Sequence, residues 1–173
     1  MSATNRGVAL SEELRAVAEA GLKPGQPQPL FDAAALILAE APGWRLLTVM
    51  AVASERLELV RLYSSDTANY PLGGRKSKRG LLWSDRVLVR GEPYVGNDTA
   101  GLRWAFDDSA TLESLGLGAV INQPIRWNGR VIGTLNLLDV EGSYDAPWQT
   151  GATAAVAALL RPALIDAGYQ PSA

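Results

Sequence analysis

Residues 114–139 read SLGLGAVINQPIRWNGRVIGTLNLLD, and this stretch decides the fold. Asn128-Gly129 is the strongest short signal of a two-residue hairpin turn, and it separates two segments, 119–127 and 130–139. Both segments are apolar at even and at odd positions, which is typical of strands covered on both faces. The stretch therefore predicts an antiparallel hairpin between two layers of structure.

Polar side chains interrupt this apolar hairpin at four places, namely Asn122, Gln123, Thr134 and Asn136. Buried amides and hydroxyls need hydrogen-bond partners. These four residues therefore have two possible roles. They either hold loops against the sheet or face a ligand cavity.

The composition indicates one soluble globular domain. The chain has 173 residues, of which 47% are hydrophobic and 20% charged, and its net charge is −2. This balance argues against electrostatic capture of nucleic acid or of an anionic membrane. An N-terminus without an apolar signal core, in a chain without a membrane-length apolar run, predicts a cytoplasmic protein.

The sequence contains no cysteine and no histidine. This excludes disulfides, Cys/His zinc sites and haem with a His or Cys axial ligand. It also excludes thiol nucleophiles and Ser–His catalysis within this sequence. We expect no metal and no cofactor.

The order of expected elements is that of an α+β domain. Ser11 is a candidate cap for the first helix, and Pro162 is expected to kink or end the last one. We expect helices at 11–22, 30–40, 98–106, 108–115 and 146–167, and strands at 44–53, 57–63, 86–89, 119–127 and 130–139, with a polar, turn-rich segment at 64–80.

Several motifs in this order resemble the GAF domain family, here as a stand-alone, single-domain member. They are RLYSSDTANYP at 61–71, GEPYVGND at 91–98, residues 114–124 and NGRVIGTLNLLD at 128–139, with Tyr144 before the closing helix. The resemblance covers about residues 30–166. It divides the chain into an N-terminal segment and helix of the same unit (1–27), a GAF-like domain (28–168) and a C-terminal tail (169–173).

The resemblance implies a GAF-like α+β fold. Terminal helices would lie on one face of a central antiparallel sheet, and an irregular cover would enclose a small-molecule pocket on the other. It implies a non-catalytic sensory or regulatory module that binds a ligand and forms a homodimer through its helices. Output would pass through dimer geometry or a protein partner.

The best-known chemistries of the family do not transfer to this sequence. Tetrapyrrole attachment and free methionine sulfoxide reduction use cysteine, which is absent. Cyclic-nucleotide-binding members carry Asn-Lys…Phe-x-x-x-Asp-Glu. Here Asn97-Asp98…Phe106-Asp107-Asp108 lacks the lysine and the Phe–Asp spacing.

Two clusters are candidate ligand contacts. The loop GGRKSKRG at 73–80 carries four cations and is either solvated or a clamp for a phosphate or carboxylate. The aromatic and charged residues of 83–107 either line a cavity or seal the sheet, with Arg103 paired to Asp98 or Asp107. The candidate ligand-binding residues are Tyr63, Tyr70, Trp83, Tyr94, Asp98, Arg103, Trp104, Asp107 and Asn122.

Two other functions remain open at this point. Asp98, Asp107 and Asp108 suit acid–base work on a small molecule or a divalent cation, although Asp98 and Asp108 also suit helix caps. Alternatively, the domain is a dimerisation module whose pocket is collapsed. No catalytic residue is assigned.

Overall fold

One antiparallel sheet separates two layers of helices. The computed structural model describes residues 3–54, 58–78 and 80–169. The strand order is β3-β2-β1-β6-β5-β4. The strands are β1 (Leu46–Ser54), β2 (Glu58–Ser64), β3 (Arg75–Ser77), β4 (Tyr94–Gly96), β5 (Ala119–Trp127) and β6 (Arg130–Asp139).

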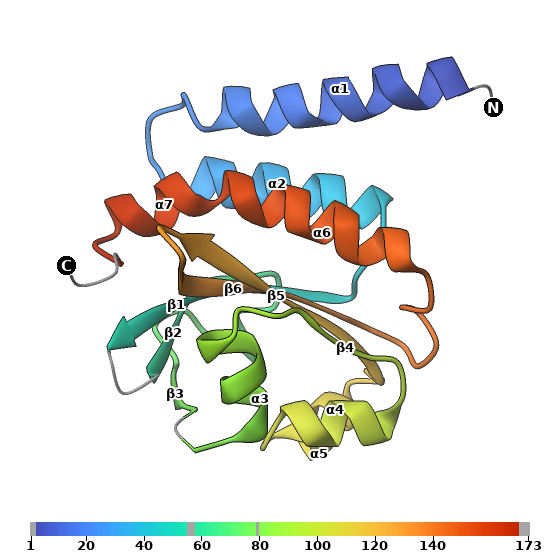
Figure 1. Ribbon diagram of the computed structural model, residues 1–173, viewed down its shortest axis with the longest axis vertical. Helices are drawn as coiled ribbons and strands as arrows, with labels where there is room; N and C mark the ends of the chain where they lie inside the picture. The colour runs from blue at the N-terminus through green and yellow to red at the C-terminus, as the bar shows by residue number, and fades with distance from the viewer. Residues whose placement is uncertain (1–2, 55–57, 79, 170–173) are drawn as a thin grey trace.

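The helices divide between the two faces of the sheet (Figure 1). One face is covered by α2 (Gln28–Glu40), α6 (Pro147–Leu159) and α7 (Arg161–Asp166), and α1 (Ala3–Ala20) packs on the outer side of α2 and α6. The other is covered by α3 (Leu82–Ser84), the π-helical turn η1 (Asp85–Val89), α4 (Thr99–Ala105) and α5 (Ser109–Ser114). The predicted α+β architecture, with terminal helices on one side of an antiparallel sheet and an irregular cover on the other, is confirmed.

The central hairpin forms as its sequence predicts. Asn128 and Gly129 both have positive φ angles, 48° and 76°, as a type I′ turn requires. Strands β5 and β6 then pair with Asn122 opposite Asn136. This register places the two buried amides side by side at the middle of the sheet.

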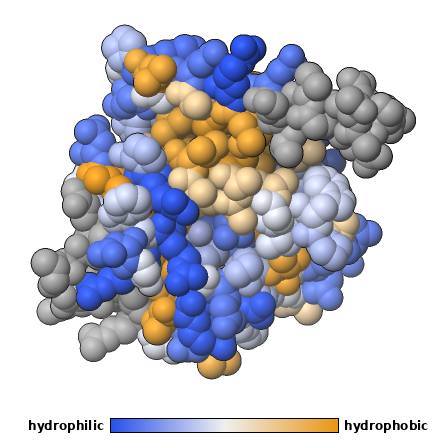
Figure 2. Space-filling model, turned by 45° about the horizontal axis from the view of Figure 1, so that its top comes forward, coloured by the Kyte–Doolittle hydropathy of each residue, from blue (hydrophilic) through white to orange (hydrophobic). Residues whose placement is uncertain are grey.

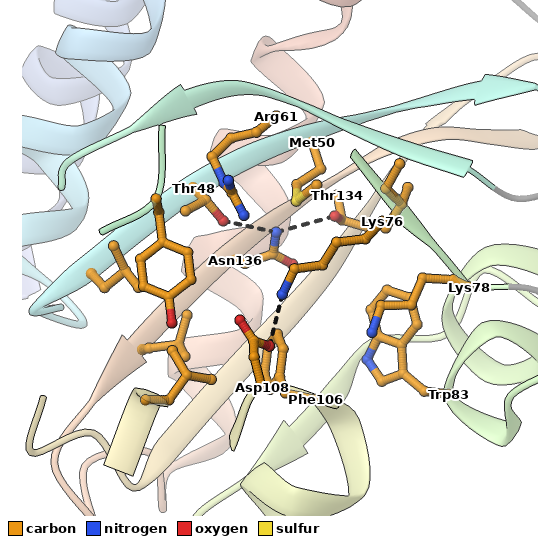
Figure 3. Close-up of a pocket in the computed structure, with 15 residues that line it drawn as sticks. Thr48, Met50, Arg61, Lys76, Lys78, Trp83, Phe106, Asp108, Thr134 and Asn136 are labelled. Carbon is orange, nitrogen blue, oxygen red and sulfur yellow. Dashed lines mark hydrogen bonds and ion pairs between the residues drawn. The ribbon is translucent and has the colours of Figure 1, made fainter. Parts of the chain in front are cut away.

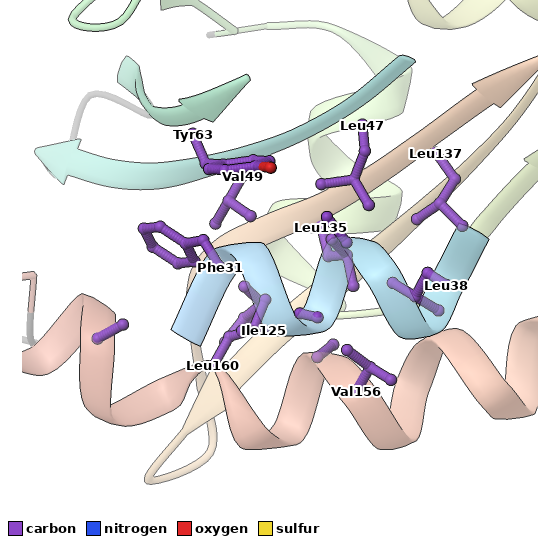
Figure 4. Close-up of a cluster of buried hydrophobic side chains, with 14 of the residues drawn as sticks. Phe31, Leu38, Leu47, Val49, Tyr63, Ile125, Leu135, Leu137, Val156 and Leu160 are labelled. Atoms are coloured by element: carbon purple, nitrogen blue, oxygen red, sulfur yellow. The ribbon is translucent and has the colours of Figure 1, made fainter. Parts of the chain in front are cut away.

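The helical face holds the larger of two hydrophobic cores (Figure 4). Phe31 and Leu38 of α2 pack there against sheet residues such as Leu135, which is fully buried. Val156 of α6 and Leu160, which follows the end of α6, complete this core on the helical side. The α2 and α6 helices are therefore amphipathic elements held by tertiary packing.

A second core lies between the sheet and the irregular cover. Its sheet residues include Met50, Leu59 and Leu138, and Trp83 and Val87 contact them from the cover. Two cores on opposite faces explain why β1, β5 and β6 are apolar at both parities. The cavity that forms the candidate functional site lies within this second core.

Three local expectations are wrong. Helix α1 begins at Ala3 and runs through Ser11, so Ser11 is not its cap. Residues 86–89 belong to the η1 turn rather than to a strand, because the adjacent residues Val87 and Leu88 are both buried against the sheet and a short apolar run has no decisive period. The last helix is not continuous over 146–167, because α6 ends at Leu159 and the separate helix α7 begins at Arg161; the break expected at Pro162 is thereby confirmed.

The edge strands β3 and β4 were not expected from the sequence. Each has three residues, and each is held by one neighbour, β2 or β5. Within the described part of the chain, no helix is long and apolar enough to cross a membrane.

Candidate functional site

A small cavity lies between the sheet and its irregular cover (Figure 3). Its volume is about 30 Å³, room for about two water molecules. The wall is formed by strands β1, β2, β3 and β6, by the loop after β2 and by the cover. Its residues are Leu46, Thr48, Met50, Leu59, Arg61, Tyr70, Lys76, Lys78, Trp83, Phe106, Asp108, Leu112, Thr134, Asn136 and Leu138.

A chain of buried hydrogen bonds joins the cover to the sheet at this cavity. Trp83 Nε1 donates to Asn122 Oδ1 at 2.9 Å, and Asn122 Nδ2 donates to Asn136 Oδ1 at 2.8 Å. Asn136 Nδ2 then donates to the hydroxyl oxygens of Thr48 and Thr134, each at 3.2 Å. Asn122 therefore holds the cover and Asn136 reaches the cavity wall, whereas Gln123 does neither and donates to the neighbouring Pro124 carbonyl at 3.4 Å.

Strand β3 divides the basic loop between solvent and cavity. Arg75 points outward and pairs with Glu58 at 2.7 Å, with 57% of its side chain exposed. Its neighbour Lys76 points to the opposite side, as alternation along a strand requires, and pairs with Asp108 at 2.7 Å. The loop is therefore neither wholly solvated nor wholly a clamp.

Lys78 is the most unusual side chain of the site. It is 3% exposed, and its Nζ has no hydrogen-bond partner among the described residues. The ammonium lies 5.4 Å from the Trp83 ring centroid and 5.8 Å from that of Phe106. Burial lowers the pKa of Lys78, and the neighbouring carboxylates offset this only in part.

Arg61 is a second buried cation at the wall. It is 6% exposed, and its Nη1 donates to the Pro71 carbonyl at 3.0 Å, while Nε has no partner in the described ranges. Burial lowers the pKa of Arg61. The adjacent Tyr70 ring lies 5.1 Å from the guanidinium, and burial, aided by Asp108, raises the pKa of Tyr70 to about 12.

The structure brings some of the predicted ligand residues to the cavity. Tyr70 and Trp83 line it, and Asn122 lies behind Trp83 in the hydrogen-bond chain. Tyr94 belongs to the same core, but its hydroxyl donates to the Gly101 carbonyl. Tyr63 belongs to the opposite core, where its ring centroid is 5.7 Å from that of Phe31, so it does not reach the cavity.

The remaining candidates lie on the outer surface of the cover. Asp98 caps α4 by accepting from the Gly101 amide, and Trp104 is 43% exposed beside Tyr94. Arg103 forms two 2.8 Å hydrogen bonds with Glu113 rather than with either expected aspartate. Asp107 is 75% exposed and lies 3.8 Å from Lys78 Nζ.

Sequence reasoning missed several lining residues, above all Arg61, Met50 and Thr48. An arginine within the otherwise apolar run of β2 was the available signal for Arg61. No comparable signal marks Met50 or Thr48, because an ordinary core strand contains the same residue types. Which face each residue occupies follows only from the sheet register.

A separate groove of about 770 Å³ lies on the helical side, between α1, α2 and α7. Its walls are mostly apolar and include Val17, Leu22, Leu30, Trp127, Leu159 and Ile165. Figure 2 shows apolar surface gathered into one broad patch on this side of the molecule. Leu36 of α2, on the helical side of the sheet, is 71% exposed.

Comparison with known structures identifies the fold as that of GAF domains, as the sequence motifs predict. No family model and no curated protein matches the sequence. The GAF domain of a phosphoenolpyruvate-protein phosphotransferase from Coxiella burnetii superposes with a TM-score of 0.74 at 20% identity, over 91% of this chain and 93% of that one. The corresponding Acinetobacter domain gives 0.73 at 13% identity over 99% of both chains. A type II free methionine-R-sulfoxide reductase from Thermoplasma acidophilum gives 0.59 at 13%, over 79% and 90%.

Proposed function

We propose that this GAF-like domain is a sensory or regulatory module that binds a small molecule in the cavity between β1, β2, β6 and the cover. The observation that carries the proposal is the polar character of a buried wall. Thr48, Thr134 and Asn136 face the cavity from the two central strands, at positions where packing alone favours apolar side chains.

The cavity must widen to hold a ligand, because its present volume of about 30 Å³ is far below the several hundred Å³ typical of ligand sites. The cover is the part suited to such a change. It consists of short helices and the η1 π-turn, an irregularity that often marks functional sites. Ligand binding would thereby alter the position of the cover relative to the sheet.

We propose binding without turnover. The three aspartates considered for catalysis have other roles, since Asp98 caps α4, Asp108 pairs with Lys76 and Asp107 is largely exposed. Within the ranges that the structure describes, no three acidic side chains gather to hold a metal ion. The sequence has no cysteine for the thiol chemistry of sulfoxide reduction.

The test is a thermal-shift screen of small metabolites, combined with mass spectrometry of any compound that co-purifies. A ligand of the cavity should raise the melting temperature of the parent. Leu59→Phe enlarges a buried wall residue and should abolish that shift, whereas Leu72→Phe, on a 53% exposed leucine, should not. A ligand recovered chemically unchanged supports a sensor. Chemical conversion of the ligand would show an enzyme, and a chain that binds nothing would be a dimerisation module with a collapsed pocket.

We also propose that the helical side forms a homodimer, which would transmit the ligand state directly or to a protein partner. The apolar groove and the exposed Leu36 support this, because contiguous apolar surface of this extent is a feature of interfaces. Light scattering should give a dimer mass for the parent and for Leu72→Glu, and a monomer mass for Leu36→Glu. A monomeric parent at concentrations well above micromolar would rule the proposal out.

A further inference from the structure

Donors predominate among the polar groups of the cavity that have no partner in the described residues, and the Tyr70 hydroxyl, which can donate or accept, is also among them. Asn136 donates to the oxygens of Thr48 and Thr134, so each threonine keeps its own hydroxyl proton to donate. Lys78 Nζ and Arg61 Nε add N–H groups without partners among the described residues. A ligand that accepts hydrogen bonds would satisfy all of these groups, whereas a ligand that only donates would leave Lys78 and Arg61 unsatisfied.

The charges of the wall are also unbalanced. Arg61, Lys76 and Lys78 line the cavity, but Asp108 is the one carboxylate among the described residues of its lining. Asp108 pairs with Lys76 at 2.7 Å and is thereby engaged. Figure 3 shows Arg61 and Lys78 on two sides of the cavity, with the Lys76–Asp108 ion pair between them.

The ion pair of Lys78 does not compensate for its burial. Asp107 lies 3.8 Å from Nζ, outside hydrogen-bond distance, and its own side chain is 75% exposed to water. A buried ammonium without a hydrogen-bonded partner destabilises the folded state. The position therefore suits a ligand that supplies the missing hydrogen-bond acceptor.

We infer that the cavity binds a small organic monocarboxylate, with its carboxylate at Lys78 and its apolar body against the leucines and Met50. This inference rests on the proposed function and specifies its ligand class. The cations Arg61, Lys76 and Lys78 exceed the carboxylates Asp107 and Asp108 by one positive charge. One carboxylate on the ligand balances this excess. A phosphate dianion would exceed that balance and would meet a wall that is mostly apolar, formed by Leu46, Met50, Leu59, Leu112 and Leu138.

The experiment compares charged and neutral probes of equal shape. Acetate, propanoate and butanoate are titrated beside acetamide, propanamide and butanamide at constant ionic strength, in a buffer free of other carboxylates. Melting temperature and calorimetric binding are recorded. The carboxylates should bind at least tenfold more tightly than the amides, with affinity increasing from acetate to butanoate. Inorganic phosphate should bind more weakly than butanoate.

Lys78→Met gives a second, independent readout. Methionine keeps the length of the side chain and removes the buried charge, so the ligand-free variant should melt at a higher temperature while butanoate affinity falls at least tenfold. Lys23→Met removes the same charge from an exposed loop and should change neither quantity. Lys78→Gln serves the same purpose if Lys78→Met does not fold.

The contrary results distinguish failure of the inferred ligand class from failure of the proposed sensory function. Equal binding of carboxylates and amides, tighter binding of phosphate, or undiminished butanoate binding by Lys78→Met would overturn the inference. If the metabolite screen finds a neutral ligand that Leu59→Phe abolishes while carboxylates do not bind, the inference fails and the sensory function stands. If neither the probes nor the screen yields a ligand, both fail.

Discussion

Gly133→Ala tests how closely β1 and α7 approach β6 at Gly133. Gly133 of β6 lies opposite Ala51 of β1 and Ile125 of β5. A Cβ built on Gly133 would overlap the Met50 carbonyl oxygen and a Leu164 methyl group of α7. The carbonyl belongs to the backbone of β1, so the clash cannot be relieved by a side-chain rotation alone.

Overpacking of this kind costs about 3 kcal/mol at the upper end of the usual range. For a domain of this size the melting temperature changes by about 2–4 °C per kcal/mol, so we expect Gly133→Ala to lower it by about 6–12 °C. Scanning calorimetry and urea unfolding followed by far-UV circular dichroism measure the effect.

Gly151→Ala is the matched control. Gly151 is an exposed position within α6, and a Cβ there has no atom within 4 Å. Alanine should stabilise this helix by about 0.5–1 kcal/mol, because glycine has the greater unfolded-state entropy. If Gly133→Ala does not lower the melting temperature, β1 and α7 do not approach β6 as closely as described.

Three other predictions concern the core, the cover and pH. Leu135→Ala should lower the free energy of unfolding by about 2–5 kcal/mol in urea titrations, because Leu135 is fully buried. Arg103→Ala and Trp104→Ala should leave both the melting temperature and butanoate binding nearly unchanged in thermal-shift and calorimetric titrations, since both side chains lie on the outer surface of the cover. A drop in butanoate affinity in either would place the site elsewhere. Unfolding measured across pH should show stability rising as the pH approaches the ordinary pKa of lysine, because folded Lys78 has the lower pKa and the unfolded chain therefore binds more protons between the two pKa values. Tyr70 has the opposite effect at higher pH, because its folded pKa is raised to about 12 and the folded state keeps the phenolic proton longer. Lys78→Met should remove the rise, and an unchanged profile in that variant would assign the rise to another group.

The hairpin is determined by neighbouring residues in the sequence, whereas the site depends on packing between distant segments. Asn128-Gly129 specifies its turn through two adjacent backbone conformations, which is why the hairpin could be predicted in detail. Arg103 and Trp104 were expected at the pocket because they lie in an aromatic segment. Their direction depends instead on how α4 packs on the sheet, and that packing turns them outward.

The basic loop illustrates the same difference at closer range. Arg75 and Lys76 are neighbours of similar chemistry, yet Arg75 pairs with Glu58 outside and Lys76 with Asp108 at the cavity. Their directions follow from the pairing of β3 with β2, in which Lys76 lies opposite Leu59. Composition predicted a positive loop, but only the strand pairing separates its cations.

The sequence by itself determined the order of the main elements, the central hairpin, the need for two covering layers and the exclusion of cysteine and histidine chemistry. These properties depend on residue identity, turn preference and short-range apolar pattern, which act within a few residues. The tertiary structure alone decided that Lys78 and Arg61 are buried at one cavity while Tyr63 belongs to the other core. Burial and charge balance arise between segments far apart in the chain, so the register and packing of the sheet had to be known before either could be assigned.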